Sequence, residues 1–223
     1  TGPVSCPAPG GTRGGMRIGI IGAGRIGSTL AGHFDRIGHE VVISNARGPQ
    51  SLTGLVAELG GSVRAGTVEE AADFGEVVVV SIPYGRYREL PADRLRDKVV
   101  IDTCNYYPER DGHDADLDAD VTTSSEKIKA HTGSNLVKAF NTLPWQQLRD
   151  HAYRGDGVPR VAVPLSGSDD GAKAVVAGLT RDIGFDPVIA GNLGQGGRRH
   201  QPGTSVYATE LPAAEMDALL HAA

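Results

Sequence analysis

The sequence predicts an α/β fold: a doubly wound, mainly parallel sheet with a small C-terminal extension. An apolar run at residues 18–21 leads directly into a glycine-rich turn and then a segment of helical composition, residues 28–34. Four consecutive valines, residues 77–80, are what a strand buried on both faces requires. Further short apolar runs alternate with helical segments, which favours parallel strands joined by helices.

The turn after the first strand reads Gly22-x-Gly24-x-x-Gly27. Gly22 permits the tight turn, Gly24 lets a pyrophosphate approach the backbone, and Gly27 lets the next helix pack closely. This pattern predicts a Rossmann-type dinucleotide site with the helix N-terminus facing the phosphates. Because 31 of 223 residues are glycine, a glycine-rich turn in an ordinary α/β protein is the alternative. The predicted cofactor-binding residues here are Gly22, Ala23, Gly24, Arg25, Ile26 and Gly27.

The end of the second predicted strand, residues 39–44, indicates which dinucleotide binds. An NAD site usually has Asp or Glu there to accept hydrogen bonds from the ribose, but this chain has no carboxylate. Ser44, Asn45 and Arg47 instead offer a hydroxyl, an amide and a guanidinium, which suit a 2′-phosphate. We therefore expect NADP(H); the alternative is a polar loop that leads into the next helix.

The middle of the chain continues the alternation. We expect a capping box at residues 67–70, a turn at residues 83–85, and a loop at residues 104–112. The acidic stretch 114–120 is expected to be a solvated loop, because it lacks the glycine and terminal glutamate of a calcium motif. The predicted helices are residues 52–59, 67–75 and 124–131, and the predicted strands are residues 62–65, 76–83, 98–103 and 135–140.

The last third of the chain predicts two more strands, residues 160–165 and 187–190. Pro144 suits the first position of a helix that runs to residue 151. Ser168, Asp169 and Asp170 are expected to cap a helix at 172–183, and a final helix covers 213–221. We divide the chain into a disordered leader, cloning remnant or upstream sequence (1–15), a dinucleotide-binding domain (16–134), and an acceptor-site and dimerisation portion on the same sheet (135–223).

Composition excludes several classes of function. The formal charge is −5 and the 22 Lys and Arg residues are scattered, so we expect no nucleic-acid surface. No apolar run approaches the roughly 20 residues that span a membrane, and residues 1–15 do not form a secretory signal. Cys6 and Cys104 are too few for a disulfide framework, which favours a reducing cytoplasm.

Several separated motifs carry a family resemblance: the opening glycines, Ser44-Asn-Ala-Arg47, Ser81-Ile-Pro83, Val137-Lys-Ala-Phe-Asn-Thr142 and Gly167-Ser-Asp-Asp170. With these motifs the chain resembles, over residues 16–211, the NADPH-dependent reductases of the deazaflavin coenzyme F420. Those enzymes share their nucleotide module with the six-transmembrane metalloreductases and, more distantly, with pyrroline-5-carboxylate reductase. The chain departs from them in its Gly-Ala-Gly turn, its aromatic loop 105–108 and its segment 201–203.

The resemblance implies a cytoplasmic, NADPH-dependent oxidoreductase that passes hydride to a deazaflavin (F420) or flavin ring. Two alternatives stay open: a reductase of a small imine, enone or carbonyl compound, and a dinucleotide-sensing protein without turnover. The acceptor is expected at the carboxyl edge of the sheet, where open α/β sheets bind ligands. The further cofactor-binding residues predicted at this edge are Ser81, Ile82, Pro83, Tyr84, Asn105, Ala139 and Asn141.

Asn141 and Thr142 are the predicted catalytic residues, which would hydrogen-bond the acceptor ring or the carboxamide; strand-end capping is the alternative. Other side chains have paired interpretations as well. Tyr84, Tyr106 and Trp145 either wall the acceptor or pack in the core, and Arg198 and Arg199 either bind an anionic tail or are solvated. His131 and His200 are possible proton donors but are expected to be exposed, and Met216, Leu219 and Leu220 form an apolar face expected to pair in a homodimer.

Overall fold

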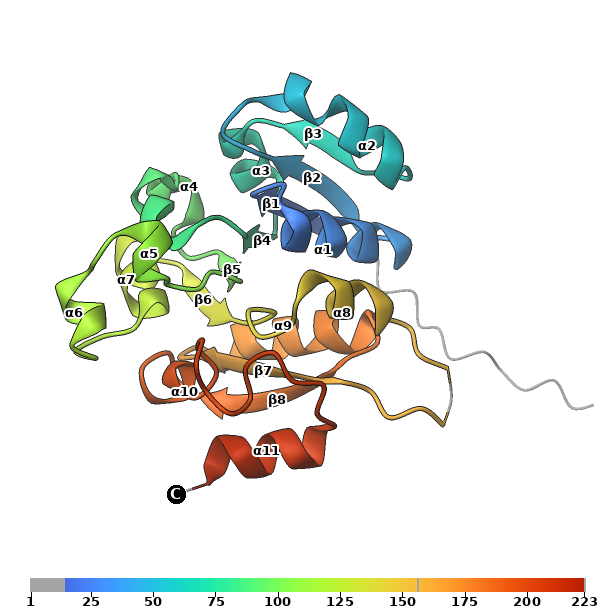
Figure 1. Cartoon of the computed structure of the whole chain (residues 1–223). Coiled ribbons are helices and arrows are strands. Elements are labelled where there is room, and N and C mark those ends of the chain that lie inside the picture. The colour runs from blue at the N-terminus through green and yellow to red at the C-terminus, as the bar shows by residue number, and fades with distance from the viewer. Residues whose placement is uncertain (1–14, 156, 223) are drawn as a thin grey trace, which may run out of the picture.

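The computed structural model describes residues 15–155 and 157–222, and the predicted leader lies outside this range except for Gly15. All eight strands join in one sheet of order β3-β2-β1-β4-β5-β6-β7-β8 (Figure 1). Every pairing is parallel except that of β6 with β7. The strands are β1 (Arg17–Ile21), β2 (Glu40–Ser44), β3 (Arg64–Gly66), β4 (Val77–Val80), β5 (Val99–Asp102), β6 (Asn135–Lys138), β7 (Ala162–Gly167) and β8 (Asp186–Gly191).

Helices cover both faces of the sheet, so the predicted doubly wound α/β fold is confirmed. α1 (Arg25–Arg36), α2 (Thr53–Leu59), α8 (Trp145–Asp150) and α9 (Asp170–Asp182) share one apolar core with the sheet. α3 (Val68–Phe74), α4 (Ala92–Leu95) and α7 (Ser124–Thr132) lie on the other core. The remaining helices are η1 (Pro49–Leu52), η2 (Tyr84–Glu89), α5 (Pro108–Asp111), α6 (Ala115–Asp118), α10 (Gln195–Arg198) and α11 (Ala213–His221).

The centre of the sheet is its most apolar part. All four valines of β4 are buried between β1 and β5, as their sequence predicts. The strand ends at Val80, three residues earlier than expected, because Pro83 opens η2 directly after it. Likewise β6 ends at Lys138, since Phe140 takes a left-handed φ of 58° that no strand accommodates.

Helix starts follow the predicted capping chemistry. The Thr67 hydroxyl accepts a hydrogen bond from the Glu70 amide, and the Glu70 carboxylate accepts one from the Thr67 amide, which completes the capping box of α3. Asp169 caps α9 through the amide of Ala172. Pro144 stands one position earlier than predicted, as the N-cap of α8.

Two expectations need correction. Residues 114–120 are exposed as predicted apart from Asp114 and Leu117, but they contain α6 instead of a loop, and Asp114 accepts hydrogen bonds from the Tyr84 hydroxyl and the Lys127 ammonium. The apolar face of α11 packs inside its own chain, because Met216 and Leu220 are buried with Ala162 and Val188. Of its three predicted contact residues only Leu219 is exposed, at 42%. Within the described residues, no helix has the length and apolar character needed to cross a membrane.

Candidate active site

The turn between β1 and α1 is closed at two glycines and open at the third. A Cβ at Gly22, whose φ is +114°, would lie 2.0 Å from the carbonyl oxygen of Ser81, and one at Gly27 would lie 1.9 Å from that of Gly22. At Gly24, the N-cap of α1, a Cβ would meet nothing within 4 Å, and no side chain caps the helix there. The amides that open α1 therefore face free space, which fits a pyrophosphate.

A cleft of about 290 Å³ begins at this turn. Its walls come from the end of β4, the end of β5 and the loop that follows β5. The structure thus brings together seven of the predicted cofactor-binding residues: Gly24, Arg25, Ile26, Ser81, Ile82, Pro83 and Asn105. Thr103, Cys104, Tyr107 and Arg110 complete the lining.

At the end of β2, only part of the predicted phosphate site is available. Ser44 is fully buried and its hydroxyl donates to the carbonyl of Ile20, so it does not face a ligand. Asn45 accepts from the amide of Arg47 and from the Ser51 hydroxyl, which shapes the loop. The Arg47 side chain is exposed and, among the described residues, pairs with no acid. Arg47 is therefore the residue available to a 2′-phosphate.

Tyr84 was predicted to bind the cofactor, but it does not line the cleft. Its side chain is 3% exposed, stacks on Tyr87 at 5.1 Å between ring centroids, and donates from its hydroxyl to Asp114. Burial and the Asp114 carboxylate raise the pKa of Tyr84 well above its ordinary value. The tyrosine packs beneath the loop, so the core-packing interpretation is correct for this residue.

Asn141 lies at the centre of a buried hydrogen-bond network. Its Oδ1 accepts from Nδ1 of His200 at 3.0 Å, and its Nδ2 donates to the His200 carbonyl at 2.8 Å and to Asn105 Oδ1 at 3.1 Å. Both amide hydrogens are therefore committed within the protein. Asn141 is placed to fix its neighbours, and it carries no spare donor for an acceptor ring.

His200 is fully buried, so the expectation that it would be exposed is wrong. Because Asn141 Oδ1 can only accept, His200 Nδ1 donates to it, and His200 Nε2 accepts from the Ser166 hydroxyl at 2.8 Å. Burial lowers the pKa of His200 to about 3, and the Lys138 charge adds to this. The imidazole is therefore neutral near pH 7 and is no proton donor to the cleft. His131, half-buried on α7, bonds the Leu90 carbonyl instead.

Thr142 and Trp145 have buried polar atoms without a partner. Among the described residues, neither the Thr142 hydroxyl nor the Trp145 indole N–H has a hydrogen-bond partner, and Thr142 is only 1% exposed. Two guanidiniums pack on the indole ring, with Arg25 at 5.1 Å and Arg149 at 5.0 Å from its centroid. Trp145 thus connects the first turn of α1 to the turn that carries Thr142. Ala139 beside them is fully buried.

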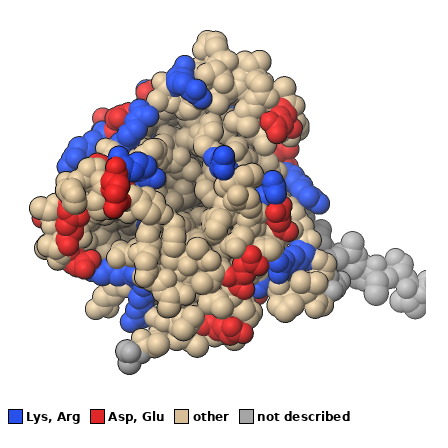
Figure 2. Space-filling model, in the orientation of Figure 1, with Lys and Arg blue, Asp and Glu red and all other residues tan. Residues whose placement is uncertain are grey.

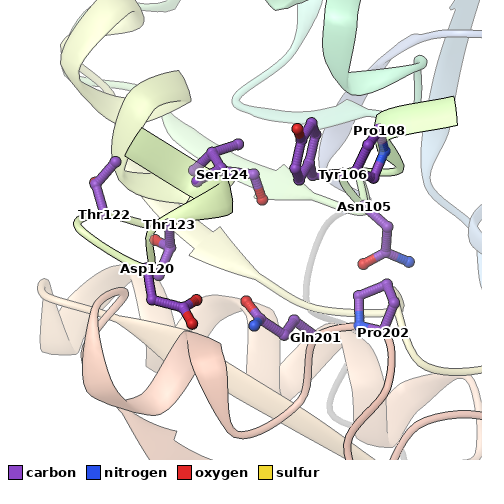
Figure 3. A pocket seen from close by; sticks show the side chains of 10 residues that line it. Asn105, Tyr106, Pro108, Asp120, Thr122, Thr123, Ser124, Gln201 and Pro202 are labelled. Carbon is purple, nitrogen blue, oxygen red and sulfur yellow. The ribbon is translucent and has the colours of Figure 1, made fainter. Parts of the chain in front are cut away.

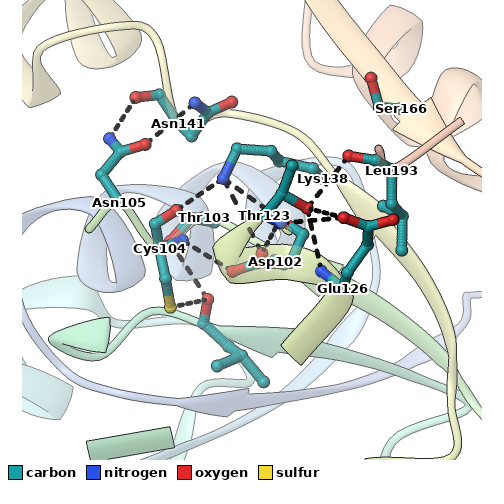
Figure 4. A network of polar contacts seen from close by, with 12 residues as sticks. Asp102, Thr103, Cys104, Asn105, Thr123, Glu126, Lys138, Asn141, Ser166 and Leu193 are labelled. Carbon is teal, nitrogen blue, oxygen red and sulfur yellow. Dashed lines mark hydrogen bonds and ion pairs between the residues drawn. The ribbon is translucent and has the colours of Figure 1, made fainter. Parts of the chain in front are cut away.

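A buried cation underlies the loop after β5 (Figure 4). The ammonium of Lys138 donates to the Cys104 carbonyl at 2.8 Å and to Ser125 Oγ at 3.2 Å, and it lies 4.0 Å from Asp102 Oδ2. Ser125 in turn donates to Asp102 at 2.6 Å. This network holds the Cys104–Asn105 backbone at the edge of the cleft.

A second cavity of about 190 Å³ adjoins the cleft through Asn105 (Figure 3). The side chains of Asp120 and Gln201 point toward one another on one side of the cavity, and Tyr106 and Asn105 lie on the other side. Asp120 is the one charged residue of its lining. Tyr106 lines this second cavity, and its hydroxyl donates to Asp118.

The two arginines predicted to hold an anionic tail line neither the cleft nor the second cavity. Arg198 donates to the carbonyl of Asp120 and lines a separate surface groove with Glu126 and Lys129, and Arg199 is exposed. Lys, Arg, Asp and Glu are interspersed over the face in Figure 2, with no patch of one sign. The solvated interpretation is the better one for Arg199.

The sequence did not point to Tyr107, Arg110 or Tyr207 as site residues. Tyr107 and Arg110 line the cleft, and the Tyr107 hydroxyl lies 2.5 Å from that of Tyr207. The aromatic loop 105–108 was the available signal for Tyr107. Nothing in the sequence relates Tyr107 to a residue 100 positions later.

Residues 17–106 match the family profile described as NADP oxidoreductase, coenzyme F420-dependent. No curated protein matches the chain. A hypothetical protein from Sinorhizobium meliloti is 32% identical with a TM-score of 0.78, covering 88% of this chain and 95% of its own. A protein from Arthrobacter sp. FB24, assigned as an F420-dependent NADP reductase, is 24% identical with a TM-score of 0.69, covering 88% and 99%. An imine reductase from Myxococcus stipitatus in complex with NADP+ is 19% identical with a TM-score of 0.58, covering 82% and 57%, and shares the fold.

Proposed function

The chain belongs to the family of NADP oxidoreductases that depend on coenzyme F420, and from this premise we propose that it transfers hydride between NADP(H) and a deazaflavin ring. It is an NADP-dependent oxidoreductase by family. The observation that carries the finer proposal is the cleft that joins the open glycine turn to the Asn105 loop. Such a cleft can hold a nicotinamide with one face free for a second ring.

The cofactor supplies the hydride, and the protein supplies binding and orientation. The opening amides of α1 would bind the pyrophosphate at Gly24, where the backbone is uncovered. Arg47 would pair with the 2′-phosphate by a charge-assisted hydrogen bond. Ser81, Ile82 and Pro83 would form the wall behind the nicotinamide.

The acceptor would lie over the nicotinamide, between the Pro83 turn and the turn of Asn141 and Thr142. The unpartnered hydroxyl of Thr142 is the free polar group of that turn, whereas the amide of Asn141 is committed to its neighbours. We therefore assign acceptor contact to Thr142 and a positioning role to Asn141.

A small imine, enone or carbonyl compound is the second candidate for the acceptor. The cavity beside Asn105 measures about 190 Å³ and has no cationic residue in its lining, only the carboxylate of Asp120. A small neutral or protonated acceptor suits that cavity better than a ligand with an anionic tail.

An acceptor panel tests the proposal. NADPH oxidation would be followed with coenzyme F420, free FMN, a cyclic imine and an enone as separate acceptors. We expect rapid oxidation with coenzyme F420 and little with FMN. Turnover of the imine or enone with none of F420 would overturn the deazaflavin proposal in favour of the second candidate.

We further propose a cytoplasmic homodimer. Because the α11 face is used within the chain, the two copies would pair through another surface. Light scattering coupled to size-exclusion chromatography would test this, and a single mass near that of one chain would contradict it.

A further inference from the structure

Two tyrosines from distant parts of the chain meet at the edge of the cleft. Tyr107 follows β5 and lines the cleft, and Tyr207 lies between α10 and α11. Their hydroxyl oxygens are 2.5 Å apart, and both side chains are half-buried. The segment that carries Tyr207 contacts the turn of Asn141 and Thr142, called the acceptor turn below, because the amide of Ala208 donates to the carbonyl of Thr142 at 2.9 Å.

The neighbouring side-chain amides bear on which of the two tyrosine hydroxyls donates to the other. Asn105 Nδ2 donates to the Asn141 carbonyl at 2.8 Å and to the Tyr207 oxygen at 3.4 Å, while Asn105 Oδ1 accepts from Asn141. Either hydroxyl can donate in the tyrosine pair, and the hydrogen from Asn105, which takes one acceptor position of the Tyr207 oxygen, favours Tyr207 as the donor to Tyr107. The hydroxyl hydrogen of Tyr107 is then left for a third partner.

An ion pair lies beside the Tyr107 ring. The Arg110 guanidinium lies 4.9 Å from the centre of the Tyr107 ring and is fixed by Asp111 at 2.8 Å and by the Asn105 carbonyl at 2.7 Å. The guanidinium packs on the ring as one half of an ion pair, which helps to hold Tyr107 in place at the edge of the cleft. Within the described part of the chain, the charged or titratable groups in contact with Tyr107 are Arg110 on its ring, Asp111 at its amide and Tyr207 at its hydroxyl.

Other candidate acids at this edge are unsuitable. Burial holds the pKa of His200 at about 3, and both of its ring nitrogens already have partners. The Cys104 thiol is directed to the Val80 carbonyl, and burial raises its pKa well above the ordinary value. Tyr107 is the remaining acid that lines the cleft.

We propose that Tyr107 donates the proton that accompanies hydride transfer to the acceptor, with Tyr207 as the group that returns it. Hydride from NADPH forms a C–H bond on the acceptor, and the electron pair released there moves to a ring nitrogen of the deazaflavin, or to the imine nitrogen or carbonyl oxygen. That atom takes the Tyr107 proton, so the acceptor gains two electrons and two hydrogens while NADPH becomes NADP+. Tyr207 reprotonates Tyr107, and solvent restores Tyr207. This step rests on the proposed hydride transfer but holds for either class of acceptor.

Kinetics of tyrosine variants test the proposal with whichever acceptor of the panel the unaltered protein reduces. Tyr107→Phe should lower kcat about 10²–10³-fold, the usual contribution of a general acid, with the Kd of NADPH unchanged. Turnover by the unaltered protein should fall at alkaline pH as Tyr107 ionises, and this limb should disappear in Tyr107→Phe. Tyr207→Phe should lower kcat about tenfold and keep the limb at a shifted pH. Tyr87→Phe, in the core beneath the loop, is the matched control and should behave as the unaltered protein.

A Tyr107→Phe variant with kcat within about threefold of the unaltered protein and the same alkaline limb would overturn the proposal. A measurement without turnover gives a second test. The tyrosinate absorbance of the protein, titrated with pH, should show that removing Tyr207 changes the ionisation of Tyr107. Independent ionisation of the two tyrosines would also overturn the proposal. The identity of the acceptor that is reduced decides the proposed function separately.

Discussion

The two halves of the cleft use their polar groups in opposite ways. At the ends of β1 and β2, the α1 amides have no cap and Arg47 has no acidic partner among the described residues. At the ends of β5 and β6, Asn105, Asn141 and His200 bond one another instead. A charged cofactor supplies the missing partners when it binds, whereas an uncharged ring needs a rigid frame that exists beforehand. We therefore expect substitutions at Gly24 and Arg47 to spare the fold, and loss of the Asn141 amide to lower the stability of the protein.

The largest effect on cofactor binding is expected from Gly24→Val, in the open half of the cleft at the ends of β1 and β2. A Cβ at Gly24 meets nothing within 4 Å, so the fold should survive, but the branched side chain would occupy the space for the pyrophosphate. We expect no measurable NADPH binding by calorimetry, with the circular dichroism spectrum unchanged. Gly27→Val is the contrasting variant and should not fold stably, since its Cβ would lie 1.9 Å from a carbonyl oxygen. Normal NADPH affinity in Gly24→Val would place the site elsewhere.

Acid should lower the stability of the folded protein through the buried ring of His200. The folded protein holds the pKa of His200 at about 3, against 6.5 for the ordinary side chain, because the ring is buried. Between these values the unfolded chain binds a proton that the folded chain does not, so stability falls as pH decreases from about 6.5 towards 3. The unfolding free energy in urea, measured across this range, should decline less steeply in His200→Gln.

His33 contributes in the same direction, because burial also lowers its pKa. Some acid sensitivity should therefore remain in the variant. Equal slopes for the variant and the unaltered protein would show that His200 is not buried as a neutral ring.

Asn141→Ala should break the network itself. The substitution leaves the His200 N–H and the Asn105 carbonyl without partners, at a cost of about 1–3 kcal/mol for each buried group. We expect a lower urea midpoint and a fall in kcat/KM for the acceptor of roughly tenfold or more, while the Kd of NADPH changes little. A loss of NADPH affinity as large as the loss of turnover would contradict the separation of the two halves.

Arg47→Ala should affect the open half alone. Loss of one charge-assisted hydrogen bond should weaken NADPH by about 1–3 kcal/mol, which is roughly 5- to 150-fold in Kd. NADH, which lacks the 2′-phosphate, should bind the variant and the unaltered protein alike. An equal loss for both cofactors would remove Arg47 from the phosphate site.

Thr142→Val is the mildest test, because its hydroxyl has no hydrogen bond to lose. Stability should stay within about 1 kcal/mol of the unaltered protein, since the two side chains have similar volume and no partner is left unsatisfied. Turnover of the acceptor should still fall, as the variant removes the free polar group of the acceptor turn. Unchanged turnover would return Thr142 to a purely structural role.

Local sequence signals predicted most of the framework. The final helix matches its predicted bounds, and the capping box at Thr67 and the cap at Asp169 are where the sequence places them. These features depend on neighbouring residues, so a short window contains the information. The burial of Met216 and Leu220 could not be read this way, because an apolar helix face looks the same whether it covers its own sheet or a partner.

In the site too, features set by neighbouring residues were predicted, and features set by distant contacts were not. The open glycine turn and Arg47 lie within single loops, and their availability agrees with the sequence interpretation. Ser44 does not, because its hydroxyl turns towards the sheet to bond Ile20. The burial of His200 and the pairing of Tyr107 with Tyr207 depend on contacts between residues 59 and 100 positions apart. Only the folded arrangement of the segment after α10 reveals them.

The position of Trp145 should make its fluorescence sensitive to cofactor binding. It is the single tryptophan of the chain, and the guanidinium of Arg25, the first residue of the helix proposed to bind the phosphates, packs on its indole ring. Any cofactor charge that draws Arg25 away changes the electrostatic surroundings of the indole, and with them its emission. The reduced nicotinamide also absorbs in the range where tryptophan emits, so energy transfer would quench this one fluorophore. Occupancy of the cofactor site can therefore be followed in the unlabelled protein, separately from any reaction at the acceptor.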